Sequence, residues 1–265
     1  MPYALNRGVK IYWEEQGSGD PILMIMGLSF TLDMWHRTVP LIARTHRAIV
    51  FDNRGVGRSD VPRRPYSIRA MAEDARAVLD AAGVERAHVI GASMGGMIAQ
   101  ELALRHPSRL RSLILACTYC GGLRAKFPEA RRFRHQARWP GQNAQERILA
   151  FNPLLYDEGT PSERIEEDNA IRVRWHPTAR GYLNQLWAIL RWSSYRRLPR
   201  LSVPTLIVHG ESDLILPPEN AKILARRIPH ARTRMIPNAG HIFTTDQPEI
   251  SHRMLLEFFE ELGFA

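Results

Sequence analysis

Short apolar runs alternate with helical patterns along most of this chain, and this alternation limits the fold more than any other feature of the sequence. A continuous apolar run is typical of a strand that is buried on both faces of a sheet. Such runs lie at 21–27, 46–52, 87–93, 110–117 and 204–210, and we predict the last strand at 231–237. Because strands that alternate with helices form parallel sheets covered on both sides, the sequence predicts an α/β fold. The run at 9–16 alternates apolar and polar residues, so we expect an antiparallel strand or two before the parallel sheet.

The predicted helices begin and end at residues that suit helix termini. Ser67 can cap the helix that follows it, and Gly83 can end that helix. The helical pattern that begins at Met34 contains Pro40, so we expect a short or broken helix there. Pro107 should stop the helix that precedes it.

Residues from about 122 to 199 interrupt the alternation of strands and helices. This segment contains no buried-strand run, and we interpret it as a mostly helical insertion between two strands. The predicted domains are therefore a core of residues 1–121 and 200–265 and a cap of residues 122–199. For any single tryptophan of the cap we favour packing in the core, whereas their number together suggests an apolar or ring-binding site. The cap holds four of the six tryptophans, Trp139, Trp175, Trp187 and Trp192.

Charge and composition narrow the classes of function. The 265 residues carry a formal net charge of +9, but the arginines are scattered without a basic stripe, so we predict no nucleic-acid partner. No stretch approaches the roughly 20 apolar residues that cross a bilayer, and the N-terminal residues lack a signal-peptide core. We therefore predict no membrane partner and a cytoplasmic location. Cys117 and Cys120 are too few for a disulfide framework and lack a second ligand pair for zinc, so we expect two reduced thiols.

The sequence GASMG at residues 91–95 places a serine between a predicted strand and a predicted helix. A nucleophile elbow holds its serine in a strained backbone conformation, so the neighbouring residues must be small. Gly91, Gly95 and Gly96 meet that need. The alternative is a glycine-rich turn that only lets the helix pack closely. The pattern alone is weak evidence, because chance would produce it in roughly one in ten chains of this length.

A serine hydroxyl needs a base to become a nucleophile, and an acid must orient that base. His241 lies in PNAGHIF, in a loop between the last strand and the last helix, where doubly wound sheets present functional groups. Asp213 follows the strand at 204–210 and lies at the same predicted edge of the sheet. We prefer Asp213 to Asp52, which has a structural role in a glycine-rich turn, and to Asp246, which we expect to cap the last helix. The predicted triad is Ser93, Asp213 and His241, which is the chain order expected for a triad built on a G-x-S-x-G turn.

An oxyanion hole needs two backbone N–H donors close to the nucleophile. One should be the N–H of Met94, the residue after Ser93, and the other should come from the loop after the strand at 21–27. We assign the second donor to the N–H of Leu28, because Gly27 lets that loop turn tightly.

These motifs make the chain resemble the α/β-hydrolase superfamily over nearly its whole length. The matching segments are MGLSF, FDNRGVGRSD, GASMGGMIAQ, PTLIVHGESDLILP and NAGHI. The sequences of these segments are most similar to those of small bacterial esterases, enol-lactonases and cofactor-free haloperoxidases. The resemblance implies an eight-stranded, mostly parallel sheet with helices on both faces and a helical cap after the sixth strand. It also implies a Ser–Asp–His triad that works without a cofactor or a metal.

One residue departs from the pattern of many relatives, which carry histidine where this chain has Met26, before the oxyanion-loop glycine. That residue shapes the loop rather than reacting, so the departure affects the expected position of Leu28 and not the triad. Dehalogenases and epoxide hydrolases of the same fold carry an aspartate nucleophile, and serine at position 93 argues against both.

We therefore expect a hydrolase that cleaves carboxylic esters through an acyl-enzyme, with a small apolar or aromatic ester, or a lactone, as its partner. The open alternatives are a lactonase or C–C bond hydrolase with the same triad, and a perhydrolase or haloperoxidase in which peroxide replaces water. A binding protein on the same scaffold is the alternative from another class, and complete triad chemistry argues against it. The sequence does not decide the oligomeric state, and a homodimer is left open.

Overall fold

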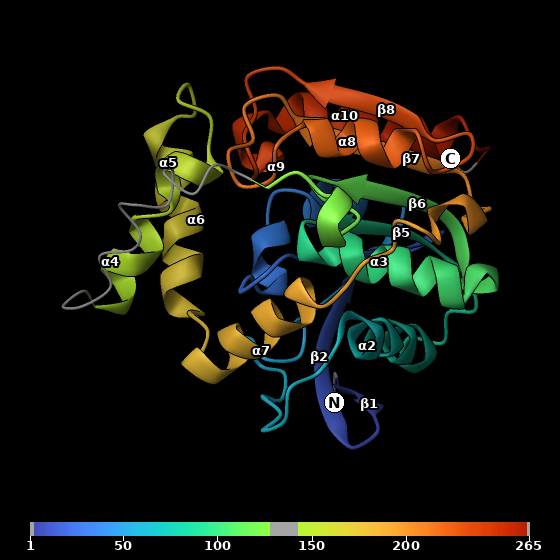
Figure 1. Cartoon of the computed structure of the whole chain (residues 1–265), viewed down its shortest axis with the longest axis horizontal. Helices are drawn as coiled ribbons and strands as arrows, with labels where there is room; N and C mark the ends of the chain where they lie inside the picture. Colours follow the sequence, from blue (N-terminus) through green and yellow to red (C-terminus); the bar gives the residue numbers. More distant parts are fainter. Residues whose placement is uncertain (1–2, 128–142, 264–265) are drawn as a thin grey trace.

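The predicted strands form part of one eight-stranded sheet in the computed structural model, which describes residues 3–127 and 143–263 (Figure 1). The strands lie in the order β1-β2-β4-β3-β5-β6-β7-β8. Their bounds are β1 Tyr3–Asn6, β2 Val9–Gln16, β3 Pro21–Ile25, β4 Arg47–Phe51, β5 Ala87–Ala92, β6 Leu110–Ala116, β7 Thr205–Gly210 and β8 Arg232–Ile236. The prediction of an eight-stranded sheet with helices is confirmed.

The sheet is antiparallel at one edge and parallel from there on. β1 pairs with β2 and β2 with β4 in antiparallel fashion, whereas β4, β3, β5, β6, β7 and β8 pair in parallel. In this register Ala92 at the end of β5 lies beside Ala116 of β6, and Ala116 lies beside Val208 of β7. The carboxyl ends of the central strands therefore meet at one edge of the sheet, where doubly wound proteins bind ligands.

Helices cover both faces of the sheet, as the continuous apolar strands require. Leu23 and Ile25 of β3 pack into the core that contains residues of α2 (Ile68–Ala81), α3 (Met94–Arg105) and α8 (Glu219–Ala225). Ile22 and Met24, which point to the other face, pack into the core with residues of α1 (Val39–Ile42) and α10 (Pro248–Glu260). No helix within the described ranges is both long and apolar enough to cross a membrane.

The residues expected at helix termini are found there. The Ser67 hydroxyl accepts a hydrogen bond from the Ala70 N–H at 3.2 Å, and Gly83 follows α2 with a φ of +67°. The segment with Pro40 is broken into a 3-10 helix, η1 (Leu32–Trp35), and the four-residue α1. α3 ends at Arg105, two residues before Pro107.

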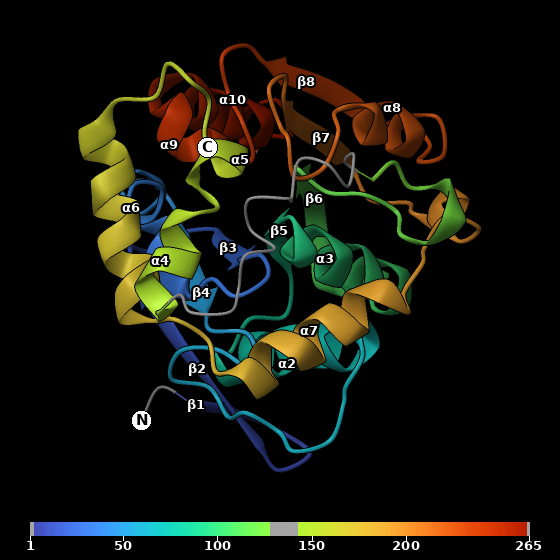
Figure 2. The ribbon, with the colours of Figure 1, turned by 60° about the vertical axis from the view of Figure 1, so that its left-hand side comes forward.

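The segment between β6 and β7 is mostly helical where the structure describes it. It contains α4 (Ala144–Leu149), α5 (Asn152–Leu155), α6 (Ser162–Arg174) and α7 (Ala179–Leu190). We call residues 122–199 the insertion; these exact boundaries stay a prediction. In Figures 1 and 2, α4, α5 and α6 stand at one side of the molecule, while α7 returns toward α2.

The tryptophans of the insertion have different environments. Trp192 is buried and its indole N–H donates to Glu101 at 2.9 Å. The expectation of core packing is wrong for Trp187, whose residue is 48% exposed, with Leu183 and Leu190 on the same exposed face of α7. The reason is that α7 buries its other face, which includes Gln185 and Ala188. Trp175 stacks on the Arg58 guanidinium at 4.1 Å, and Trp139 lies outside the described residues.

Candidate active site

Ser93 occupies a strained turn between β5 and α3. Its backbone has φ 56° and ψ −120°, a conformation that is costly for a residue with a side chain. The turn is fixed from both sides, because the Ser93 N–H donates to Ala116 O at 2.9 Å and the Thr118 hydroxyl donates to Ser93 O at 2.7 Å.

The glycines around Ser93 are required by close backbone contacts. A Cβ on Gly95 would lie 2.0 Å from the carbonyl oxygen of Ile25, and a Cβ on Gly91 would lie 2.4 Å from that of Gly95. Real Cβ atoms do not come so close to backbone atoms, so the expectation of small neighbours is explained by packing between β3, β5 and α3.

Asp213 and His241 form a hydrogen-bonded pair at the same edge of the sheet. Asp213 lies three residues beyond β7, and His241 lies between β8 and the short helix α9 (Phe243–Asp246). The distance between His241 Nδ1 and Asp213 Oδ2 is 2.8 Å, and both side chains are buried. Asp213 Oδ1 accepts the N–H groups of Ile215 and Leu216, both at 2.9 Å, which holds the carboxylate in place.

A second histidine, His209 of β7, also contacts the Asp213 carboxylate. Its Nε2 lies 3.3 Å from Asp213 Oδ2 and donates to Leu216 O at 2.8 Å. Burial alone would raise the pKa of the Asp213 carboxyl, but the charge of His241 and the hydrogen bonds from both histidines hold that pKa well below its usual range. Asp213 is therefore ionised at neutral pH, as an acid that orients an imidazole must be.

The residues at the end of β6 contact both the Ser93 turn and the loop that carries His241. Ala116 bonds to Ser93, and the next residue, Cys117, donates its N–H to Val208 O and lies with its Sγ 3.9 Å from Gly240 O. Across residues 3–127 and 143–263, no hydrogen bond joins Ser93 Oγ to His241. Such contacts are often longer in free enzymes and shorten when a substrate binds.

The loop after β3 lies directly against Ser93. A Cβ on Gly27 would be 3.0 Å from the Ser93 Cβ, so only glycine fits there without displacement. In the described part of the chain, the N–H groups of Leu28 and Met94 donate no hydrogen bond. Both donors are thus free for an oxyanion, and their role remains a prediction.

Two side chains that the sequence analysis missed hold this loop in position. The Asn53 side-chain amide donates to Met26 O at 2.8 Å. The Gln185 side chain, from α7, accepts the Ser29 N–H at 2.9 Å and donates to Arg54 O at 3.0 Å. Asn53 follows β4 at the functional edge of the sheet, which is a usable signal, whereas nothing in the sequence marks Gln185.

Replacing Gln185 with leucine leaves the half-buried Ser29 N–H without its acceptor, whereas Arg54 C=O keeps the hydrogen bond from the Tyr66 hydroxyl at 3.0 Å. We expect the free energy of unfolding to fall by about 1 kcal/mol, the lower end of the about 1–3 kcal/mol that a buried polar group without a partner costs, because this N–H is half-buried. Denaturant unfolding measures this loss. Leu183→Ala, on the exposed face of the same helix, should stay within about 0.5 kcal/mol of the wild type. Equal stability of the two variants would contradict the prediction.

The remaining carboxylates near the site have structural partners. Asp52 accepts the backbone N–H groups of Leu32 at 2.8 Å and Arg58 at 2.9 Å, in agreement with the structural role that we assigned to it. The expectation that Asp246 caps the last helix is wrong: Gln247 is the N-cap residue of α10, and no side chain caps it. The Asp246 carboxylate instead accepts the N–H of Gly240, which precedes His241.

The two cysteines are free, buried thiols. Burial raises the pKa of both thiols, that of Cys120 to about 11, so neither is a reactive thiolate at neutral pH. Cys117, His209 and Asp213 offer ligand atoms within 4.8 Å of one another, which is the spacing of a metal site. The Asp213 carboxylate, however, already contacts both His209 and His241. The three residues are therefore part of the environment of the histidine–aspartate pair.

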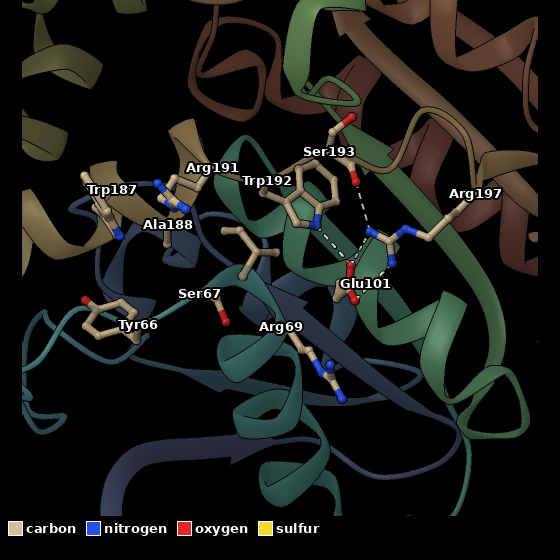
Figure 3. A pocket seen from close by; sticks show the side chains of 11 residues that line it. Tyr66, Ser67, Arg69, Glu101, Trp187, Ala188, Arg191, Trp192, Ser193 and Arg197 are labelled. Carbon is tan, nitrogen blue, oxygen red and sulfur yellow. Dashed lines mark hydrogen bonds and ion pairs between the residues drawn. The ribbon is translucent and has the colours of Figure 1, made fainter.

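A pocket of about 300 Å³ lies between α7 and the start of α2, away from the triad residues (Figure 3). Its lining includes Trp187, Arg69 and Glu101, and it contains none of Ser93, Asp213 and His241. Glu101 is held there by the Trp192 indole and by Arg197.

A strained serine between a parallel strand and a helix, at the same sheet edge as a histidine–aspartate pair, is the arrangement of the class of α/β proteins with a G-x-S-x-G strand–helix turn. The chain matches the family described as alpha/beta hydrolase fold over residues 20–248. This protein therefore belongs to the α/β-hydrolase family, and the predicted family is confirmed.

Individual relatives of the chain are hydrolases. A protein of Azorhizobium caulinodans that is provisionally named carbamate hydrolase RutD is 35% identical over 99% of both chains. The enol-lactonase of Burkholderia xenovorans LB400 superimposes with a TM-score of 0.85 at 26% identity, covering 98% of this chain and 100% of the other. An esterase of Thermogutta terrifontis has a TM-score of 0.81 at 28% identity, covering 99% of this chain and 97% of the other. These names support hydrolase activity, and they differ in the bond that is cleaved.

Proposed function

We propose that this protein is a serine hydrolase that cleaves small carboxylic esters through an acyl-enzyme on Ser93. The observation that carries the proposal is the 2.8 Å contact between His241 Nδ1 and the ionised Asp213, at the sheet edge where Ser93 occupies its strained turn. This contact leaves Nε2 of His241 as the proton acceptor.

The proposed reaction has two steps. The Ser93 oxygen bonds to the ester carbonyl carbon while His241 Nε2 takes its proton, and the N–H groups of Leu28 and Met94 stabilise the negative oxygen. The C–O bond to the alcohol then breaks, and His241 returns the proton to that alcohol. Water attacks the acyl-enzyme with the same imidazole as base, which releases the acid and restores Ser93.

An active-site label tests this proposal. A fluorophosphonate should add once per chain, and peptide mass spectrometry should place the adduct on Ser93. The Ser93→Ala variant should take up no label. The wild type should also hydrolyse p-nitrophenyl esters of graded acyl length. Absence of an adduct and of turnover in the folded wild type would overturn the proposal.

A lactone or a carbamate is the second candidate substrate, and the names of two relatives favour it. Both carry an acyl carbon that the same nucleophile can attack, so the site residues keep their roles. A value of kcat/KM on a lactone or carbamate at least tenfold above that on the best ester would replace the ester in the proposal. Loss of that activity in Ser93→Ala would retain the site.

A further inference from the structure

Both neighbours of His241 in the chain are bonded to the insertion or to a side chain that contacts it. The Ile242 N–H donates to Leu155 O, in α5, at 3.0 Å. Gly240 packs so closely that a Cβ on it would lie 2.9 Å from Leu155 O and 3.1 Å from Asp157 N. The His241 imidazole is therefore carried by a loop whose backbone packs closely against residues 155–157.

The Asp246 carboxylate completes this connection. Its Oδ2 accepts the Gly240 N–H at 2.6 Å, and its Oδ1 accepts the Thr160 hydroxyl at 2.6 Å and the Asp157 N–H at 3.3 Å. Asp246 is only 3% exposed, so these bonds are not in competition with bulk water. One carboxylate thus joins the backbone next to His241 to the loop that precedes α6.

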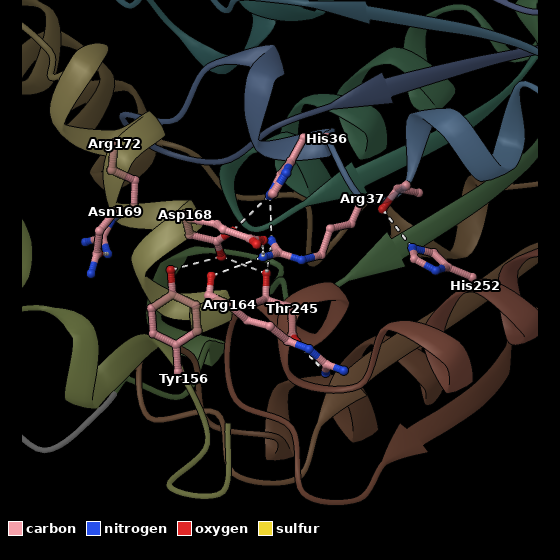
Figure 4. Close-up of polar contacts among 11 residues, drawn as sticks. His36, Arg37, Tyr156, Arg164, Asp168, Asn169, Arg172, Thr245 and His252 are labelled. Atoms are coloured by element: carbon pink, nitrogen blue, oxygen red, sulfur yellow. Dashed lines mark hydrogen bonds and ion pairs between the residues drawn. The ribbon is translucent and has the colours of Figure 1, made fainter. Parts of the chain in front are cut away.

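The residue before Asp246 is attached to the insertion in the same way. The Thr245 hydroxyl donates to Asp168 Oδ2 of α6 at 2.7 Å, and the Tyr156 hydroxyl donates to the same oxygen at 3.1 Å (Figure 4). Arg37 and His36 contact the other oxygen of Asp168. α9, which begins two residues after His241, is therefore one of the places where the insertion is bonded to the core.

We propose that Asp246 is a positioning residue that holds His241 in the orientation needed for proton transfer. Because Asp246 also bonds to the insertion, that orientation depends on how the insertion packs against the core. The inference rests on the proposed function of His241 as the base. It assigns to Asp246 a charged acceptor role, since an ionised carboxylate can accept from Gly240, Thr160 and Asp157 at once.

The ionisation of Asp246 gives this role a pH dependence. Burial raises the pKa of its carboxyl to about 6, against the lowering effect of the hydrogen bonds from Thr160 and Gly240. Three charged or titratable groups lie around Asp246. The charge of Asp157 also raises the pKa of Asp246, and Arg164 donates to the Asp246 backbone oxygen. The third group is the Cys117 thiol. Below about pH 6 the carboxyl gains a proton and loses part of its capacity as an acceptor. The value of kcat/KM should therefore fall as the Asp246 carboxyl gains its proton, so the acid side of the pH profile should contain an ionisation near pH 6 that belongs to Asp246.

The test compares Asp246→Asn with the wild type. We expect kcat to fall about 10- to 100-fold with little change in KM, which corresponds to the loss of about one to two buried hydrogen bonds. The ionisation that belongs to Asp246 should disappear from the acid side of the pH profile. Thr160→Val, which removes the Thr160 hydroxyl and leaves the Gly240 and Asp157 N–H groups on Asp246, should lower kcat by about three- to tenfold. Thr160→Ser should restore it, and Glu158→Gln, an exposed carboxylate of the same loop, should match the wild type.

A second measurement separates this inference from the proposed function. The proton between His241 Nδ1 and Asp213 should give a downfield ¹H NMR signal that shifts or broadens in Asp246→Asn and in Thr160→Val. This signal is observable even if the wild type neither hydrolyses esters nor takes up a phosphonate, a result that would overturn the proposed function alone. Variants with wild-type kcat, pH profile and NMR signal would overturn the positioning role. If Asp246→Asn does not fold, Thr160→Val provides the same decision.

Discussion

Replacing Ser93 with alanine is expected to lower kcat at least 10⁴-fold and to leave the fold intact. The proposed acyl-enzyme cannot form without the hydroxyl, and losses of about 10⁶-fold are known for the nucleophile of serine hydrolases. Alanine keeps the same backbone strain at φ 56°, so we expect a free energy of unfolding within about 1 kcal/mol of the wild type. Initial rates on the best substrate of the ester panel, with denaturant unfolding in parallel, measure both effects.

Ser202→Ala is the matched control for this variant, since Ser202 is an exposed serine outside the site. It should have wild-type kcat. If Ser93→Ala retained more than about one percent of the wild-type rate, another residue would have to be the nucleophile, and the role of the β5–α3 turn would have to be reassigned.

Replacing Gly95 with alanine is expected to cost at least about 3 kcal/mol of stability. The added methyl group would lie 2.0 Å from Ile25 O and 2.9 Å from Met26 O, both of which are backbone atoms. No side-chain rotation can relieve this contact, so α3 and the end of β3 would have to separate, and overpacking of this kind commonly costs 1–3 kcal/mol or more. Chemical unfolding monitored by circular dichroism measures the loss.

Gly159→Ala is the control for a glycine that has space. A Cβ there would meet only the end of the Asp157 side chain, at 3.3 Å, and its backbone φ lies outside the left-handed region. Its stability should stay within about 0.5 kcal/mol of the wild type. Similar stabilities for the two variants would mean that the approach of α3 to β3 is not rigid.

The sequence alone was sufficient to predict the sheet, because buried parallel strands appear as continuous apolar runs and the helices between them carry clear termini such as Ser67. Asp213 and His241 were also predictable, since both follow strands whose ends must meet at one edge, and they lie 2.8 Å apart there. These features depend on residues that are close to a strand end in the chain.

Features that depend on contacts between distant segments could not be predicted. Gln185 lies 156 residues from the Ser29 N–H that it accepts, and Asp246 lies 86 residues from Thr160. The exposed position of Trp187 has the same cause, since only the packed molecule decides which face of α7 is covered. The spacing of residues within one segment does not indicate which distant segment they will contact.

The bond between Gln185 and Ser29 links α7 of the insertion to the loop that lies against Ser93. A chimera that exchanged α7 for the corresponding helix of another hydrolase would therefore change the turnover number together with the choice of substrate. A variant engineered for a new selectivity should retain an amide at position 185 or supply another acceptor for the Ser29 N–H. Otherwise a change in kcat would reflect the disturbed loop as well as the new substrate preference.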